Sequence, residues 1–283
     1  MDQPSAPQRE PGEEDEGRAE REIERDPDAE NVPGAFERAI DEGLARSERS
    51  WPSLCATGLV GGLDVGVGVL ALLVVRAQTG SELLGALAFP VGFLALTLGN
   101  SELFTENFLV PVAALVAKRV TFVQLIRLWI ITLAANLAGG WIVAWLIANA
   151  LPDVHSAATD AAASYHVAGI GAASFASAVL GGMVITLLTW LQHSTNSVPA
   201  KVFAAYAFAF VLAAPPLAHS IVGSLEQFVA LVQGAPFGYA DWLGFLGWVV
   251  LGNTLGGVGL VTALRLVQVG RSKIESEQPT AAT

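Results

Sequence analysis

The stretch GNSELFTENFLVP, from Gly99 to Pro111, separates two apolar runs at residues 83–98 and 108–117. Neither run alone crosses a bilayer comfortably, but together they match a hydrocarbon core of about 30 Å at about 1.5 Å per helical residue. Lipid offers no hydrogen bonds, so backbone that leaves a helix at membrane depth must be packed in protein or line a polar path. The stretch therefore predicts one membrane helix broken at its centre, and such a break is a candidate transport site.

Charge and hydropathy divide the chain into a polar N-terminal part and an apolar remainder. Residues 1–50 carry 16 acidic and 7 basic side chains, whereas residues 51–283 carry 10 and 8, so most of the formal charge of −11 lies in the first part. No soluble core needs so much uncharged sequence, which indicates a polytopic membrane protein. Cys55 is the only cysteine. An intrachain disulfide and a cysteine-based metal cluster are therefore excluded.

Four segments are expected along the chain. Residues 1–32 are rich in acidic residues, arginine and proline, which predicts a disordered cytoplasmic tail that solubilises or tethers the protein. Residues 33–52 have apolar side chains at intervals of four, which predicts an amphipathic helix along the membrane surface. Residues 53–267 are expected to form a six-span transmembrane pore domain, and residues 268–283 a cytoplasmic C-terminal tail.

Six apolar segments predict six membrane-spanning helices, of which the second and the fifth are broken. The fifth is interrupted by APPLAHS, residues 214–220, where two prolines remove hydrogen-bond donors and clash with the preceding turn. The predicted spans are residues 54–75, 83–117, 122–149, 167–191, 201–232 and 242–264.

The distribution of cations predicts the orientation. An even number of spans places both termini on one side of the membrane. The loops on that side and the segment after the last span hold Lys118, Arg119, Lys201, Arg265, Arg271 and Lys273. The opposite loops hold only Arg76, together with three aspartates. The excess of positive charge inside therefore predicts that both termini are cytoplasmic.

An internal repeat links the two halves of the membrane domain. Asn136 and Asn253 each begin an Asn-x-x-Gly-Gly motif, in the third and sixth spans, 117 residues apart (253 − 136). Thr105 in the first break and His219 in the second lie 114 residues apart (219 − 105). Two nearly equal offsets indicate a repeat of three spans. Because three is odd, the second copy is inverted in the membrane and both breaks come to the midplane.

These motifs resemble those of the formate/nitrite transporter family, which moves small monovalent anions across prokaryotic membranes. The resemblance covers residues 54–264 and rests on Glu-Leu-Phe-Thr in the first break, His-Ser-Ile in the second, and Asn-x-x-Gly in the third and sixth spans. It implies an aquaporin-like subunit, a homopentamer with one pore per subunit, and the prokaryotic inner membrane. The expected fold class is therefore an all-α membrane protein with six transmembrane helices in two inverted three-helix repeats.

The resemblance also implies the residues of a substrate pathway. The family's central histidine falls on His219 and its facing threonine on Thr105, next to Leu103 and Phe104 in the same loop. The residues that close the pore on either side fall, by spacing, near Phe89, Phe93 and Leu212.

Three departures from the family pattern indicate a divergent, YfdC-like branch, whose substrate need not be formate or nitrite. Thr186 stands where many members have an asparagine near the histidine. Residues 157–174 contain neither Lys nor Arg, where many members have a lysine on the outer approach. Glu106 follows the threonine directly, where a small or apolar residue is usual. The missing cation and the added acid both weaken the attraction of anions.

His219 is the candidate proton-linked centre. An imidazole changes charge near neutral pH, and a bare anion is expensive at the bilayer centre. A histidine that protonates a weak-acid anion would let the neutral acid pass an apolar constriction. The alternative is a buried histidine that only hydrogen-bonds across the break.

Two neighbouring polar residues allow more than one role. Thr105 is expected to donate to His219 or to a passing oxyanion, or to cap the helical half that starts near Glu106. Glu106 itself is either part of the pathway or is stabilised by the positive start of that helix. Asp64, at the middle of the first span, is expected at a helix interface, a water-filled path or a subunit boundary.

The predicted function is the transport of small monovalent anions such as formate, nitrite or hydrosulfide, or of their neutral acids. Two alternatives are a neutral-solute channel of aquaporin type, and a membrane scaffold with an inactive pore whose acidic tail recruits a basic partner. The sequence contains no nucleophile–base pair, phosphate loop, metal-ligand cluster or basic nucleic-acid surface. We therefore expect no enzymatic activity, no cofactor or metal, and no nucleic-acid partner.

Overall fold

The structure is a computed structural model that describes residues 32–215 and 217–279. The predicted acidic tail up to residue 31, Pro216 of the second break and the last four residues lie outside the described residues. All regular elements within the described residues are helices. They are α2 (Val32–Glu48), α3 (Trp51–Thr79), α4 (Glu82–Ala88), α5 (Pro90–Gly99), η1 (Phe104–Phe108), α6 (Val110–Val116), α7 (Phe122–Ala150), η2 (Pro152–Val154), α8 (His155–Ala168), α9 (Ala172–His193), α10 (Val198–Ala213), α11 (Ser220–Val232), α12 (Tyr239–Thr254), the π-helix η3 (Leu255–Thr262), α13 (Ala263–Val269) and α14 (Arg271–Ser276).

The helices confirm the predicted multi-pass membrane architecture. Five of them are long and apolar enough to cross a membrane: α3, α4 with α5, α7, α9, and the run from α12 to α13. Shorter apolar helices complete the second span, as η1 with α6, and form both halves of the fifth span, as α10 and α11. The second span is therefore broken at residues 100–103 and the fifth between α10 and α11, as the sequence predicts.

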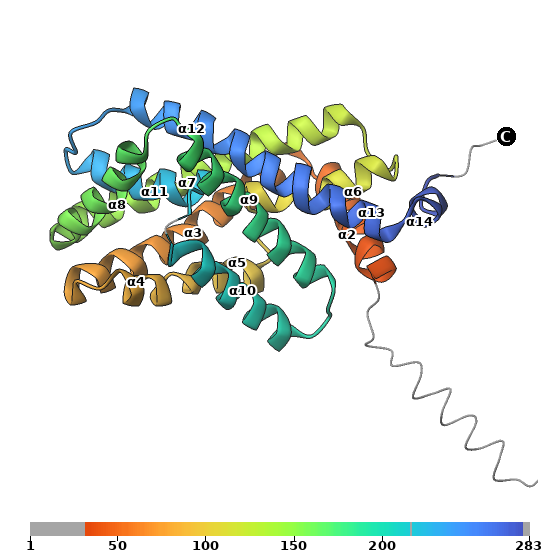
Figure 1. Ribbon diagram of the computed structural model, residues 1–283, viewed down its shortest axis with the longest axis horizontal. Coiled ribbons are helices and arrows are strands. Elements are labelled where there is room, and N and C mark those ends of the chain that lie inside the picture. The colour runs from red at the N-terminus through yellow and green to blue at the C-terminus, as the bar shows by residue number, and fades with distance from the viewer. Residues whose placement is uncertain (1–31, 216, 280–283) are drawn as a thin grey trace, which may run out of the picture.

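The long helices run roughly along the long axis of the molecule (Figure 1). Helices α2, α6, α13 and α14 lie at one end, which we call the α2 end, and α4 and α8 lie at the other, which we call the α8 end. Helix α2 contacts α6, α9 and α13, and Lys273 of α14 pairs with Glu37 of α2. Both ends of the described chain therefore lie at the α2 end.

Asn136 of α7 holds the first break in place. Its side-chain oxygen accepts a hydrogen bond from the backbone nitrogen of Phe104 at 2.8 Å. Its amide nitrogen donates to the carbonyl oxygens of Gly58, at 2.7 Å, and Glu102, at 2.8 Å. The buried amide thus replaces the backbone hydrogen bonds that the broken helix has lost.

Asn253 of α12 holds the second break in the same manner. Its side-chain oxygen accepts from the backbone nitrogen of Ser220 at 2.9 Å. Its amide nitrogen donates to the carbonyl oxygens of Ala178, at 2.7 Å, and Ala218, at 2.9 Å. The two equivalent sets of contacts confirm the three-span repeat, and they explain the Asn-x-x-Gly-Gly motifs.

The equivalent contacts also correct the register of the repeat. Ser220 is the counterpart of Phe104, which gives an offset of 116 residues (220 − 104). His219 is therefore the counterpart of Leu103 and not of Thr105. The offset of 114 between Thr105 and His219 joins two residues that face each other, not two equivalent ones.

Glycines let the break loops approach the neighbouring helices closely. A Cβ atom on Gly61 of α3 would overlap the carbonyl oxygen of Glu102. A Cβ atom on Gly181 of α9 would lie 2.5 Å from the carbonyl oxygen of Ala218, which is too close for any larger residue. This second pair of equivalent positions places each break against the first helix of its own repeat.

The apolar face of α2 packs against other helices of the protein. Phe36 and Ile40 are completely buried and belong to one apolar cluster with residues of α6 and with Trp190 of α9. The half-helix α6 has only seven residues, so α2 covers a surface that a full-length span would bury. The apolar face of α2 thus packs against protein, and contact between α2 and the membrane surface stays a prediction.

Two segments predicted as loop or tail are partly helical. The connection after the third span contains η2 and α8, and the fourth span begins at Ala172 instead of residue 167. Gly169, with a φ of 57°, ends α8 before the span begins. The predicted C-terminal tail contains α14, whose Ile274 packs against the α2 cluster.

Candidate transport site between the two breaks

The two breaks meet at His219 and Thr105. The Nε2 atom of His219 lies 2.8 Å from the Oγ1 atom of Thr105, and both side chains are fully buried. His219 is also the N-cap of α11, where its Nδ1 atom accepts a hydrogen bond from the backbone nitrogen of Val222 at 3.3 Å. An Nδ1 that accepts a backbone N–H carries no hydrogen, so the neutral ring carries it on Nε2 and donates it to Thr105. The hydroxyl hydrogen of Thr105 then points away from His219 and is available to an anion or a polar solute.

Thr105 does not cap a helix, which was one of its expected roles. It lies inside η1, whose N-cap residue is Leu103, and the residue before α6 is Leu109. Its hydroxyl oxygen instead accepts from His219 across the two breaks.

The apolar residues of the predicted pathway belong to one buried cluster. Leu103, Phe104, Phe89, Phe93 and Leu212 are all buried within the same cluster. The rings of Phe89 and Phe93 lie 5.6 Å apart, centroid to centroid. The structure thus places these five residues in one cluster, and the role of Phe89, Phe93 and Leu212 in closing a pore stays a prediction.

The hydroxyl of Thr186 forms a hydrogen bond within its own helix. Its hydroxyl donates to the carbonyl oxygen of Gly182 at 2.8 Å, one turn earlier in α9. A Cβ atom on Gly257 would meet both this hydroxyl and the ring of Phe108. Thr186 thus lies close to Gly257 of η3 and near Phe108 of η1, and its role in the substrate pathway stays a prediction.

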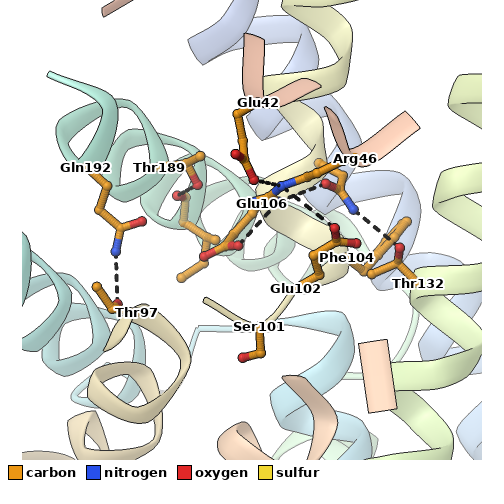
Figure 2. A network of polar contacts seen from close by, with 12 residues as sticks. Glu42, Arg46, Thr97, Ser101, Glu102, Phe104, Glu106, Thr132, Thr189 and Gln192 are labelled. Carbon is orange, nitrogen blue, oxygen red and sulfur yellow. Dashed lines mark hydrogen bonds and ion pairs between the residues drawn. The ribbon is translucent and has the colours of Figure 1, made fainter. Parts of the chain in front are cut away.

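Glu106 pairs with Arg46 of α2 (Figure 2). The Nη1 atom of Arg46 lies 3.6 Å from a carboxylate oxygen of Glu106 and donates to the Oδ1 atom of Asn107 at 3.1 Å. The Nε atom of Arg46 donates to Glu42 at 2.8 Å. Both Glu106 and Arg46 are buried. The carboxylate beside Thr105 is therefore neutralised from the α2 end.

The same network includes the other acid of the loop. Glu102 is buried, and it pairs with Arg49 and lies 3.9 Å from the Nε atom of Arg46. Burial alone raises the pKa of Glu42, but the charge of Arg46 and its hydrogen bond outweigh this and lower the pKa from its ordinary value. The network thus ties the first break to α2 with three carboxylates and two guanidinium groups.

Asp64 contacts the break from the side of α3. The hydroxyl of Ser101 donates to its Oδ2 atom at 2.5 Å. Asp64 is partly exposed. Of the three expected surroundings, the structure places it at a helix interface, against the loop of the broken span.

Polar cavities flank the buried centre. At the α2 end, a cavity of about 170 Å³ is lined by Arg46, Glu42, Glu106, His193 and Lys201, among others. At the α8 end, a cavity of about 50 Å³ reaches Leu212 and Val222, and its polar lining residues are Arg76, Glu82, Asp160, Ser164, Tyr165 and Glu226. Within the described ranges, no group of His, Cys, Asp and Glu side chains is placed to hold a metal ion.

Sequence reasoning missed three residues of these cavities. The sequence predicts that Arg46 pairs with Glu42, one turn earlier on an exposed helix. It gives no indication that Arg46 lies against the first break. Glu226 is a lone acid in the second half of the fifth span, and its position inside an apolar segment is a usable signal. Arg76 is named in the sequence only as a loop cation, and the structure places it in a cavity lining beside Ala157 and Asp160.

Comparison with known proteins identifies the family. Residues 33–267 match the family model described as formate/nitrite transporter. The chain belongs to this family. The matched residues run from the second residue of α2 into α13.

Relatives in the formate/nitrite transporter family have low sequence identity to the chain over most of their length. The inner membrane protein YfdC of Escherichia coli is 25% identical over 262 residues, which are 88% of this chain and 82% of that protein. The uncharacterized transporter YrhG of Bacillus subtilis is 24% identical over 255 residues, 86% and 96% of the two chains. The formate channel BtFdhC of Bacillus thuringiensis is 24% identical over 241 residues, 80% and 90% of the two chains.

Solved structures confirm the fold. A chain described as an FNT family ion channel matches with a TM-score of 0.71 at 19% identity, covering 81% of this chain and 96% of its own. A pentameric formate channel with formate bound matches with a TM-score of 0.65 at 19% identity, covering 78% and 98%. The all-helical, aquaporin-like fold with two broken helices is thus the fold of this family.

Proposed function

We propose that the protein transports small monovalent anions, or their neutral acids, through a pore in each subunit. Formate, nitrite and hydrosulfide are the first candidates, because one relative and one structural neighbour are named as formate channels. The observation that carries the proposal is the buried contact between Thr105 and His219, where two broken helices meet. The proposal includes a homopentamer in the prokaryotic inner membrane, both termini in the cytoplasm and no enzymatic activity.

In this proposal Thr105 and His219 act on the substrate in sequence. The hydroxyl of Thr105 donates to an oxyanion while it accepts from Nε2 of His219. A proton passes to the anion only if the ring is first charged, and a proton on Nδ1 would displace the hydrogen bond from Val222. The Nε2 proton then moves to Thr105 as the hydroxyl proton of Thr105 moves to the anion, which leaves a neutral ring with its hydrogen on Nδ1. The cap of α11 returns when Nδ1 loses this hydrogen and Nε2 is protonated again, and the neutral acid passes the apolar residues on either side.

A flux assay in proteoliposomes tests the proposal directly. The purified protein should carry formate, nitrite or hydrosulfide faster than empty liposomes do. His219→Asn keeps a polar side chain of similar size but has no titratable nitrogen, so it should alter the flux or its dependence on pH. Absence of flux for every substrate of the panel would contradict anion transport, and an unchanged profile would leave His219 with a structural role only.

A neutral-solute channel of aquaporin type is the second candidate. It is favoured by the acidic lining of the α8-end cavity, where Glu82, Asp160 and Glu226 outnumber Arg76. Measurement of current under an applied voltage separates the two functions. Anion current supports the first, whereas solute flux that formate does not compete for supports the second.

A further inference from the structure

We propose that Glu226, held by Tyr165, is a specificity-determining residue at the α8-end mouth, which admits the uncharged acid in preference to its anion. The inference rests on the proposed transport function. By the predicted orientation, this mouth is the outer one.

Glu226 is fixed in place by one hydrogen bond. The hydroxyl of Tyr165, on α8, donates to its Oε2 atom at 2.6 Å. Glu226 is 5% exposed and lines the cavity of about 50 Å³ at this mouth. Burial, and next the neighbouring carboxylate of Glu226, raise the pKa of Tyr165 well above 10, so Tyr165 stays a donor at every physiological pH. The second oxygen of Glu226 is left for water or solute in the cavity.

The position of Glu226 connects the mouth to the transport centre. His219, Val222 and Glu226 follow one another on α11 at helical spacing, so they share one face of the helix. Val222 and Leu212 line the inner part of the cavity that contains Glu226. A solute that enters from the α8 end therefore passes this carboxyl group before it reaches the apolar residues around His219.

Acidic side chains outnumber basic ones in the lining of this mouth. Arg76 is paired with Glu82 at 2.6 Å, so its charge is already compensated. Asp160 of α8 and Glu226 add two further acids to the same lining, to which α7 and α12 contribute no described residue. The titratable groups that face Glu226 are thus Tyr165, Asp160, Glu82 and Arg76. A mouth with this balance repels an anion and leaves a neutral acid unaffected.

The charge-neutral variant Glu226→Gln tests the inference. Its amide oxygen still accepts from Tyr165, so the shape is kept while the charge is removed. If the wild-type protein takes up only the acid, initial formate uptake falls by about tenfold per pH unit, following the acid fraction. In Glu226→Gln the anion also enters, so the fall should be shallower and uptake at alkaline pH should rise by about tenfold, within the range that charge-lined clefts produce. High salt should reduce the difference in formate uptake between the wild-type protein and Glu226→Gln, because it screens the charge.

Two matched variants complete the experiment. Asp153→Asn changes the same charge at the α8 end on an exposed residue outside this lining, and it should leave the pH profile unchanged. Asp160→Asn removes a charge from an exposed residue of the lining and should change the pH profile in the same direction as Glu226→Gln, but by a smaller factor. If Glu226→Gln does not fold, Asp160→Asn is the variant that tests the inference. A pH profile that Glu226→Gln and Asp160→Asn leave unchanged, or an equal loss at every pH, would overturn the inference. Wild-type protein without formate uptake at any pH would instead overturn the proposed function.

Discussion

At the scale of single residues, the site depends on polar groups that have one specific partner each. Thr105 and Glu106 are neighbours in the sequence, but their side chains have different partners. Thr105 faces His219, whereas Glu106 faces Arg46. One side chain is directed to the transport centre and the next to the α2 end. The sequence places both in the break but does not say which way each points.

Thr105→Val should reduce transport strongly. Valine has the shape of threonine but no hydroxyl, so Nε2 of His219 would lose its buried acceptor, at a cost of about 1–3 kcal/mol. Formate flux in proteoliposomes should fall by roughly tenfold or more. Thr105→Ser keeps the hydroxyl and should retain most of the flux, and equal losses in the two variants would contradict the role of this hydroxyl.

Arg46→Met should destabilise the protein. It leaves the buried carboxylates of Glu102 and Glu106 with less positive charge, and breaking a buried ion pair from one side costs about 3–5 kcal/mol. The thermal transition in detergent should fall markedly. The double variant Arg46→Met with Glu106→Gln should recover part of the loss, whereas Arg271→Met, on an exposed side chain, should have little effect.

At the scale of elements, each break is held by the asparagine of the third helix of its repeat. These two clamps follow from the Asn-x-x-Gly-Gly motifs, which the sequence shows plainly. The spans and breaks are predictable for the same reason, because apolar length and proline position determine them locally. The packing of α2 is not predictable in this way. Its burial depends on the short length of α6, which is a property of another element.

Asn136→Ala and Asn253→Ala should destabilise the protein by similar amounts. Each removes three buried hydrogen bonds, at about 1 kcal/mol each, so the expected cost is about 3 kcal/mol per variant. Thermal unfolding in detergent measures it. Asn149→Ala removes one exposed bond at the end of α7 and is the control. A clear difference between the two clamps would contradict their equivalence.

The attachment of α2 should weaken in acid. The pKa of Glu42 is lowered in the folded protein, so its pairing with Arg46 stabilises the fold at pH values above 4.5, the ordinary value. This stabilisation is lost as the pH falls through the lowered pKa. Hydrogen exchange of the amides of α2 should therefore accelerate below about pH 4.5, relative to the rest of the chain. Glu42→Gln should flatten this dependence, and Asp41→Asn, on an exposed neighbour, should not.

At the scale of the whole molecule, the two repeats form one body with different ends. The α2 end carries both ends of the described chain and the basic residues Arg46 and Lys201 beside a cavity. The α8 end carries Arg76 in a mostly acidic lining. The family resemblance predicted the fold and the pair at its centre. The acidic mouth required the structure, because Arg76, Asp160 and Glu226 come from three separate helices.

Thiol labelling tests the orientation. Cys55 is exposed and is first replaced by serine, which removes the only native thiol. Ser156→Cys, at the α8 end, should then react with a membrane-impermeant maleimide in intact cells. Ser276→Cys, in α14, should react only after the membrane is opened. The reverse pattern would place the termini outside.

The register of the repeat has a consequence for the direction of transport. The backbone frame is close to two-fold symmetric, but His219 occupies the position that Leu103 occupies in the other copy. A solute that enters from the α8 end and one that enters from the α2 end therefore meet the imidazole of His219 and the apolar side chains in different orders. An unsaturated passive pore gives equal flux under equal and opposite gradients, because both directions cross the same highest barrier. At saturating concentrations the unequal entry steps should make the flux depend on direction. The two repeats thus share a backbone scaffold, and the side chains that differ between them make the two approaches to the centre unequal.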